Sequence, residues 1–147
     1  MKVTDRFNTP MTGTLHLRAY NRDGVKVWES IGKNLIVAAG YSAAAEALAG
    51  VPGAKISHVA IGTNGDEPAD GDTAIKNAVL IPIQRIDYPT PGTVRFNFTI
   101  GYDTAPGLNI REFGLITEDG RLFSRKVREV LEKSQYLTIS GMWEIKM

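Results

Sequence analysis

Apolar and polar residues alternate along several short stretches of this chain. In residues 12–20, Leu15, Leu17 and Ala19 share one face, and the residues between them are polar or aromatic. A period of two predicts a half-buried β-strand. Further apolar stretches bounded by Gly, Pro or Asn predict strands over 25–28, 31–37, 56–61, 78–86 and 93–100, two more within 109–127, and a last one over 136–147.

The clearest turn lies within residues 109–127, where Asp119 and Gly120 separate two apolar runs. Asp-Gly favours a tight hairpin, because Gly adopts positive φ without steric cost. The strand over 78–86 contains Pro82, which cannot donate a backbone hydrogen bond. We therefore expect that strand at a sheet edge or a bulge.

One helix is expected, over residues 40–49. This segment is rich in Ala and is followed by Gly50 and Pro52, a typical helix end. Helical spacing puts one stripe toward the sheet, made of Tyr41, Ala44, Ala45 and Leu48. With about eight or nine strands, these elements predict a mainly β fold, an antiparallel β-sandwich or small barrel with one short helix.

The chain is predicted to be a single domain over residues 1–147, in which residues 1–11 form an extended arm. The arm has no hydrophobic periodicity. We expect it to contact a neighbouring protein through Phe7, Pro10 and Met11.

Composition narrows the possible functions. Seventeen Lys and Arg against sixteen Asp and Glu give a net charge of +1, which does not attract nucleic acid. The densest basic cluster, residues 121–128, is interpreted as a solvated strand face. The absence of cysteine excludes disulfides, thiol catalysis and Zn–thiolate sites. No apolar run reaches the roughly 18 residues of a membrane span, and no apolar leader is visible, so we expect a soluble protein made in the cytoplasm, without a membrane partner.

The polar loop over residues 63–73 is acidic and could be considered for calcium. Its carboxylates do not follow the EF-hand spacing, so we interpret it as an exposed turn and predict no metal or other cofactor. The candidate ligands, if an ion were bound, are Asp66, Asp70 and Asp72.

Catalytic signatures are sparse. His16 and His58 are the only histidines, and both fall on predicted strands. A hydrolase would need one of them to meet a carboxylate in a cleft. A glycan-binding module would instead need exposed aromatic residues beside the loop, whereas Trp28 and Trp143 are expected in the core. We predict that the protein is not an enzyme.

Four sequence runs carry a family resemblance: GKNLIVAAG (32–40), ISHVAIGT (56–63), IREFGL (110–115) and DGRLFSR (119–125). A polar loop ending in Asp72 and Thr73 follows the second run, and Lys133 precedes the last strand. In this order and spacing they resemble small structural proteins of tailed bacteriophages, in the tail-fibre and baseplate group. The resemblance covers about residues 30–145, and residues 1–30 have no counterpart in it. The motif residues are Asn34, Gly62, Glu112, Gly114, Gly120 and Arg125.

The resemblance implies a virion protein without enzymatic activity that assembles with copies of itself, as a trimer or ring, and with other tail proteins. Glu112 could pair with a nearby Arg and set the strand register. A position at the head–tail collar or capsid surface is the nearest alternative, and a glycan-binding module is the alternative from another class.

Overall fold

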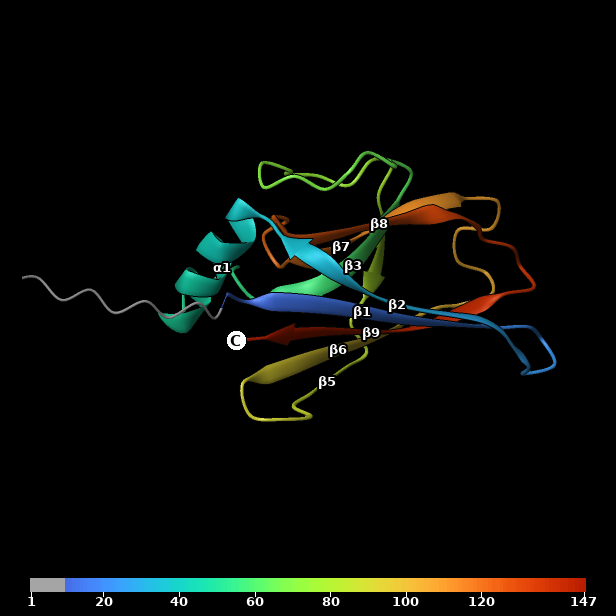
Figure 1. Ribbon diagram of the computed structural model, residues 1–147, viewed down its shortest axis with the longest axis horizontal. Helices are drawn as coiled ribbons and strands as arrows, with labels where there is room; N and C mark the ends of the chain where they lie inside the picture. Colours follow the sequence, from blue (N-terminus) through green and yellow to red (C-terminus); the bar gives the residue numbers. More distant parts are fainter. Residues whose placement is uncertain (1–9) are drawn as a thin grey trace, which may run out of the picture.

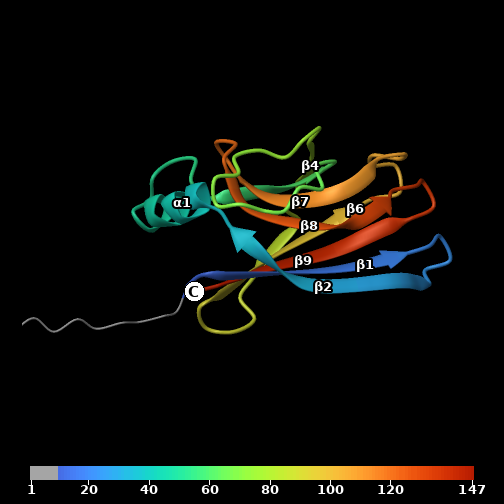
Figure 2. The same cartoon turned by 45° about the horizontal axis from the view of Figure 1, so that its top comes forward.

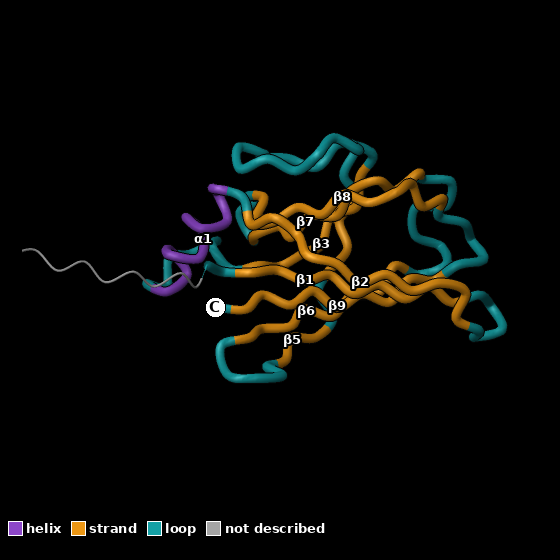
Figure 3. The backbone as a smooth tube through the Cα atoms, viewed as in Figure 1, coloured by secondary structure: helices purple, strands orange, loops and turns teal. Residues whose placement is uncertain are grey.

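The computed structural model describes residues 10–147 and shows an antiparallel β-protein with one helix (Figure 1). This confirms the predicted fold class. Figure 3 distinguishes the strands, the helix and the loops in the same view. The strands are β1 (Thr12–Tyr20), β2 (Lys26–Ile36), β3 (Ile56–Gly62), β4 (Val79–Pro82), β5 (Arg85–Asp87), β6 (Thr93–Ile100), β7 (Asn109–Thr117), β8 (Leu122–Glu132) and β9 (Thr138–Lys146), and the helix is α1 (Ala38–Leu48).

All nine strands belong to one sheet, in the order β4-β3-β7-β8-β2-β1-β9-β6-β5. The sheet curls into a half-barrel, so that its two halves face each other (Figure 2). Strand β2 joins the halves, because it pairs with β1 through Asn34 and then with β8 at Leu35 and Ile36. The stretches 25–28 and 31–37, predicted as two strands, are thus largely one long strand.

The core lies between the inner faces of the curled sheet. The alternating residues of β1 point into it as predicted, and Leu15 and Leu17 are almost fully buried. Trp143 is fully buried as well, and the ring of Phe98 lies over Gly141, where a β-carbon would collide with it. Burying this much apolar surface is the main favourable contribution to folding.

Residues 78–86 do not form the single strand that the pattern predicts. They divide into β4, which pairs with β3, and β5, which pairs with β6 at the opposite end of the strand order. The link is short: Ile83 N–H donates to Ser57 O (3.3 Å) and Gln84 N–H donates to Asn97 O (2.8 Å). Pro82 lies on an edge strand, as expected.

The helix agrees with the prediction within two residues, but the stripe expected to face the sheet is correct only at Ala44, which packs against the core. Tyr41 and Leu48 are exposed, at 45% and 87%, whereas Gly40 and Ala43 are buried. A β-carbon at Gly40 would collide with the carbonyl oxygen of Phe123. The helix therefore approaches β8 through its smallest residues, and the larger side chains turn outward.

The end of the predicted arm that the structure describes is attached to the body. Met11 is half-buried against the core, and Tyr41 Oη donates a hydrogen bond to its carbonyl oxygen (3.4 Å). Pro10 is exposed, and Phe7 lies outside the described residues. Met11 thus packs against its own chain, and its contact with a neighbouring protein stays a prediction.

Candidate functional site

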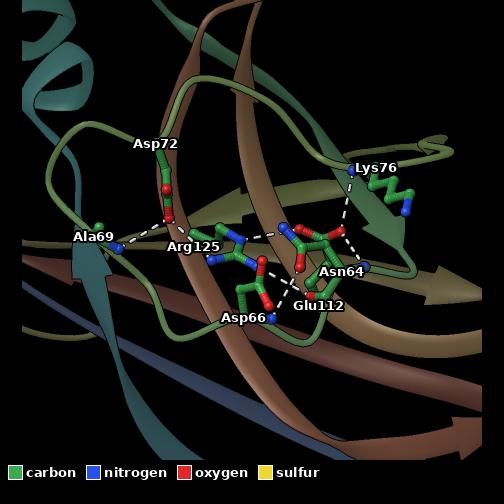
Figure 4. Close-up of polar contacts among 7 residues, drawn as sticks. All are labelled: Asn64, Asp66, Ala69, Asp72, Lys76, Glu112 and Arg125. Atoms are coloured by element: carbon green, nitrogen blue, oxygen red, sulfur yellow. Dashed lines mark hydrogen bonds and ion pairs between the residues drawn. The ribbon is translucent and has the colours of Figure 1, made fainter.

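Several motif residues that are far apart in the sequence lie beneath the loop between β3 and β4, and Figure 4 shows two of them, Glu112 and Arg125. Glu112 on β7 and Arg125 on β8 lie under this loop, and their exposed fractions are 0% and 1%. The solvated face predicted for residues 121–128 was therefore wrong at Arg125. Its charge is tolerated in the interior because it is paired and hydrogen-bonded there.

Arg125 makes three different contacts, which bring two strands and one loop together. Its Nε donates to Glu112 Oε1 (2.9 Å), its Nη1 to Asp72 Oδ2 (2.9 Å), and its Nη2 to the carbonyl oxygen of Asn64 (3.0 Å). Charge-assisted hydrogen bonds of this kind are stronger than neutral ones. The guanidinium therefore connects both ends of the acidic loop to the sheet.

Glu112 holds the loop from the other side. Its Oε2 accepts hydrogen bonds from the backbone N–H of Asn64 (2.6 Å) and of Lys76 (3.0 Å). The loop is closed further by Asp72 Oδ2, which accepts from Ala69 N–H (2.9 Å). Glu112, Arg125 and Asp72, with the backbone of Asn64 and Lys76, are called the anchor cluster below. The expected pairing of Glu112 with an arginine is present in it.

Two of the motif glycines make room for the loop to pack on the sheet. A β-carbon at Gly62 would lie 2.5 Å from the carbonyl oxygen of Lys76 and 2.9 Å from Glu112 Oε2. A β-carbon at Gly114 would lie 2.8 Å from Ile75, a buried residue that anchors the loop just beyond its acidic part. Gly120 has φ +92° in the β7–β8 turn, the conformation that the Asp-Gly signal predicts.

The three candidate metal ligands do not converge. Asp72 is bound to Arg125, whereas Asp66 and Asp70 are exposed. Asp70 contributes its carbonyl oxygen, which accepts from Ala38 N–H (2.9 Å) at the start of α1. Within residues 10–147 no group of three or more His, Cys, Asp or Glu side chains is placed to hold a metal ion.

The remaining motif residue, Asn34, lies apart from the anchor cluster. Its side chain faces Gly13 on β1, at the point where β2 passes from β1 to β8. Both Asn34 side-chain polar atoms are buried and make no hydrogen bond within the described part of the chain. Glycine at position 13 leaves the space that this amide occupies.

The two histidines lie in different surroundings. His16 Nε2 is 2.7 Å from Glu29 Oε2 on the outer face of β1 and β2, and Arg18 and Lys26 also contact that carboxylate. Hydrogen bonds from Arg18, then His16 and Lys26, lower the pKa of Glu29 to about 2. His58 Nδ1 is 2.8 Å from Ser57 Oγ. The carboxylate that a hydrolase would need is thus present beside His16, on a charged outer surface.

The aromatic residues are divided between core and surface. Trp143 is buried as expected, whereas Trp28 is only half-buried and carries the Arg128 guanidinium 4.7 Å from its ring centre.

Sequence reasoning missed Asp72 as the partner of Arg125 and Ile75 as the anchor of the loop. The signal that could have identified Ile75 is an isolated branched apolar residue at the end of a long polar segment.

Comparison with known proteins found no matching family, and neither curated proteins nor solved structures gave a match. No helix within residues 10–147 is long and apolar enough to cross a membrane.

Proposed function

We propose that this protein is a non-enzymatic structural component of a bacteriophage virion, in the tail or baseplate. In this role it links or attaches tail fibres by assembling with copies of itself, as a trimer or ring, and with other tail proteins.

The observation that carries the proposal is the convergence of the motif residues. Gly62, Glu112, Gly114 and Arg125 come from three of the four sequence runs that suggest the phage proteins. Glu112 and Arg125 belong to the anchor cluster, and the two glycines leave the space in which the loop packs beside it. Residues that act together in space support a common architecture better than separate short motifs do.

The anchor cluster also supports an assembly role physically. It holds a loop whose residues 65–67 and 69–71 are exposed, so the loop is displayed in one conformation. A surface that is already ordered loses little conformational entropy on binding, which favours association with a neighbouring protein.

The proposal is tested by labelling particles and by measuring mass. Antibodies raised against the purified chain should bind intact tailed phage particles at the tail or baseplate in electron microscopy. Labelling at the collar or capsid surface would place the protein elsewhere in the virion and overturn the tail assignment. Light scattering should give a defined oligomer of the 16.0 kDa chain. A stable monomer that binds a saccharide would overturn the assembly role.

Removal of residues 1–9 tests the arm separately. This truncation keeps Pro10 and Met11, so the half-buried packing of Met11 is retained. If the arm contacts neighbouring tail proteins, the truncated chain should fold but fail to enter particles. Normal incorporation would contradict a role for the arm.

A further inference from the structure

One long strand of the sheet has an unpaired side. Strand β2 pairs with β1 over Lys26 to Asn34, but with β8 only at Leu35 and Ile36. Among the described strands, none pairs with the other side of residues 26–33. An edge of this length presents a row of free backbone donors and acceptors, to which another strand can add.

The free edge of β2 is apolar as well as unpaired. Ile31 is 68% exposed and Val27 is 48% exposed. By contrast, the outermost strands of the sheet are poor templates, because β4 has four residues including Pro82 and β5 has three. The free edge of β2 is therefore the better place for a strand to add.

The direction of the backbone groups can be inferred from one contact. Lys126 Nζ, on β8, donates to the carbonyl oxygen of Lys33 (2.9 Å), so this carbonyl points away from β1. In an antiparallel strand the N–H and C=O of every second residue point to the same side. The backbone groups of Glu29, Ile31 and Lys33 thus face the free edge.

We infer that two copies of this chain pair through their β2 strands, antiparallel and with the two-fold axis at Ile31. In this register Ile31 lies opposite Ile31 of the second copy. Glu29 of each copy lies opposite Lys33 of the other, so the interface contains two identical pairs of opposite charges. An interface between identical patches has this self-complementary form.

The side chains of the β2 outer face support this register. Opposite charges directly across two strands stabilise their pairing, and like charges destabilise it. Registers centred on Glu29 or Lys33 would place like charges opposite each other. Lys33 makes no ion pair within residues 10–147, so its ammonium is available for one. In the dimer, the Glu29 carboxylate would contact Lys33 of the second copy in addition to Arg18 and Lys26 of its own chain. When β2 of the second copy pairs with this edge, the hydrogen bond from Lys126 Nζ to the Lys33 carbonyl oxygen is replaced by one from the new strand.

The inference does not depend on a role in a virion. A two-fold contact joins copies in pairs, and together with a trimer or ring it would give a dihedral assembly. If the contact is absent, particle labelling can still succeed, so the two proposals fail separately.

A cysteine scan tests the two-fold axis directly, because the natural chain has no cysteine. Residues opposite each other in a hydrogen-bonded pair have Cα atoms about 5.5 Å apart, within the range that a disulfide spans. Ile31→Cys should therefore form a covalent dimer under mild oxidation. The matched control is Ile86→Cys, which is 47% exposed on β5 and should remain monomeric on denaturing gels. Equal cross-linking of the two variants would overturn the inference.

Charge reversal tests the register. Lys33→Glu places Glu opposite Glu twice and should weaken dimerisation at least about tenfold in sedimentation or light scattering. The control is Arg85→Glu, which reverses a 70% exposed charge on β5 and should leave the dimer intact.

Mixing two variants completes the charge test. Glu29→Lys alone should also weaken the dimer, but an equimolar mixture of K33E and E29K should form a heterodimer, because both cross-strand pairs are again opposite in charge. Since Glu29→Lys also changes the contacts with His16 and Arg18, circular dichroism must show that the variant is folded. If it does not fold, Ile31→Cys and Lys33→Glu still decide. A wild-type monomer at high concentration, or a K33E dimer as tight as the wild type, would overturn the inference.

Discussion

Arg125→Met removes the cation that pairs with the buried carboxylate of Glu112. Methionine is close to arginine in length and fills much of the same space, so the main loss is the charge and its hydrogen bonds. Glu112 is left with two backbone donors, at 2.6 and 3.0 Å, and with Oε1 unpartnered in a site that has no exposed surface. The carbonyl oxygen of Asn64 also loses its partner, and Asp72 loses its ion pair but keeps the hydrogen bond from Ala69 N–H.

Removing one member of a buried ion pair costs about 3–5 kcal/mol, because the remaining charge stays buried without compensation. For a chain of this size, each kcal/mol lowers the midpoint of thermal unfolding by about 2–4 °C, so we expect a fall of about 10 °C. Glu112→Gln in the same chain should recover part of the loss, since the amide oxygen can still accept from Asn64 and Lys76 while the negative charge is gone. A coupling energy of about 0.5–3 kcal/mol between the two substitutions is expected.

Urea denaturation followed by the fluorescence of buried Trp143 gives the free energy of unfolding for the wild type, both single variants and the double variant. Hydrogen exchange at the amides of Asn64 and Lys76 reports the loop separately, and both should lose protection in R125M. The control is Arg111→Met, at an exposed position beside Glu112, which should change stability by less than about 0.5 kcal/mol. If R125M is no less stable than R111M, the anchor cluster does not hold the loop.

Two further perturbations test other parts of the structure. Because the pKa of Glu29 is lowered from 4.5 to about 2, its ionised form stabilises the fold above pH 4.5, and this contribution is lost as the pH falls through 2. In urea titrations, the difference in unfolding free energy between the wild type and Glu29→Gln should therefore shrink between pH 4.5 and 2. A difference that stays constant over this interval would contradict the ion contacts of Glu29. Gly62→Ala should lower the free energy of unfolding by about 1–3 kcal/mol, because its β-carbon would collide with the Lys76 carbonyl. Gly71→Ala, whose β-carbon would meet no atom within 4 Å, should be nearly neutral when both variants are compared by thermal unfolding. Equal effects of the two substitutions would refute the steric reason.

Local patterns were sufficient for most of the fold. The alternation in β1 and the Asp-Gly turn each depend on neighbouring residues only, and both were predicted correctly. The division of residues 78–86 was not predictable from them, because a mainly apolar run does not reveal that its halves pair with β3 and β6. The orientation of α1 was predicted correctly only at Ala44, for a similar reason. Its contact face depends on the close approach of Gly40 to β8, which hydrophobicity does not encode.

The contacts of the anchor cluster were likewise predictable only where they join neighbouring strands. Glu112 and Arg125 are thirteen positions apart on paired strands, so a cross-strand pair could be suspected from the hairpin alone. Asp72 is 53 positions from Arg125, and only the folded loop brings it there. Charge counting in residues 121–128 could not separate buried Arg125 from half-buried Arg121, Lys126 and Arg128, since burial of a charge depends on partners that are distant in sequence.

The pairing of β1 with β9 has a consequence for how the chain folds. Thr12 lies opposite Lys146 and Tyr20 opposite Thr138, so every residue pair of this ladder closes a loop of well over a hundred residues. Contacts of such sequence separation slow folding, and two-state β-proteins dominated by them fold in milliseconds to seconds. On the ribosome, β1 and β2 can form their hairpin early, but the inner face with Leu15 and Leu17 stays uncovered until β9 has been made. That delay makes the nascent chain, rather than the finished protein, the form most exposed to aggregation.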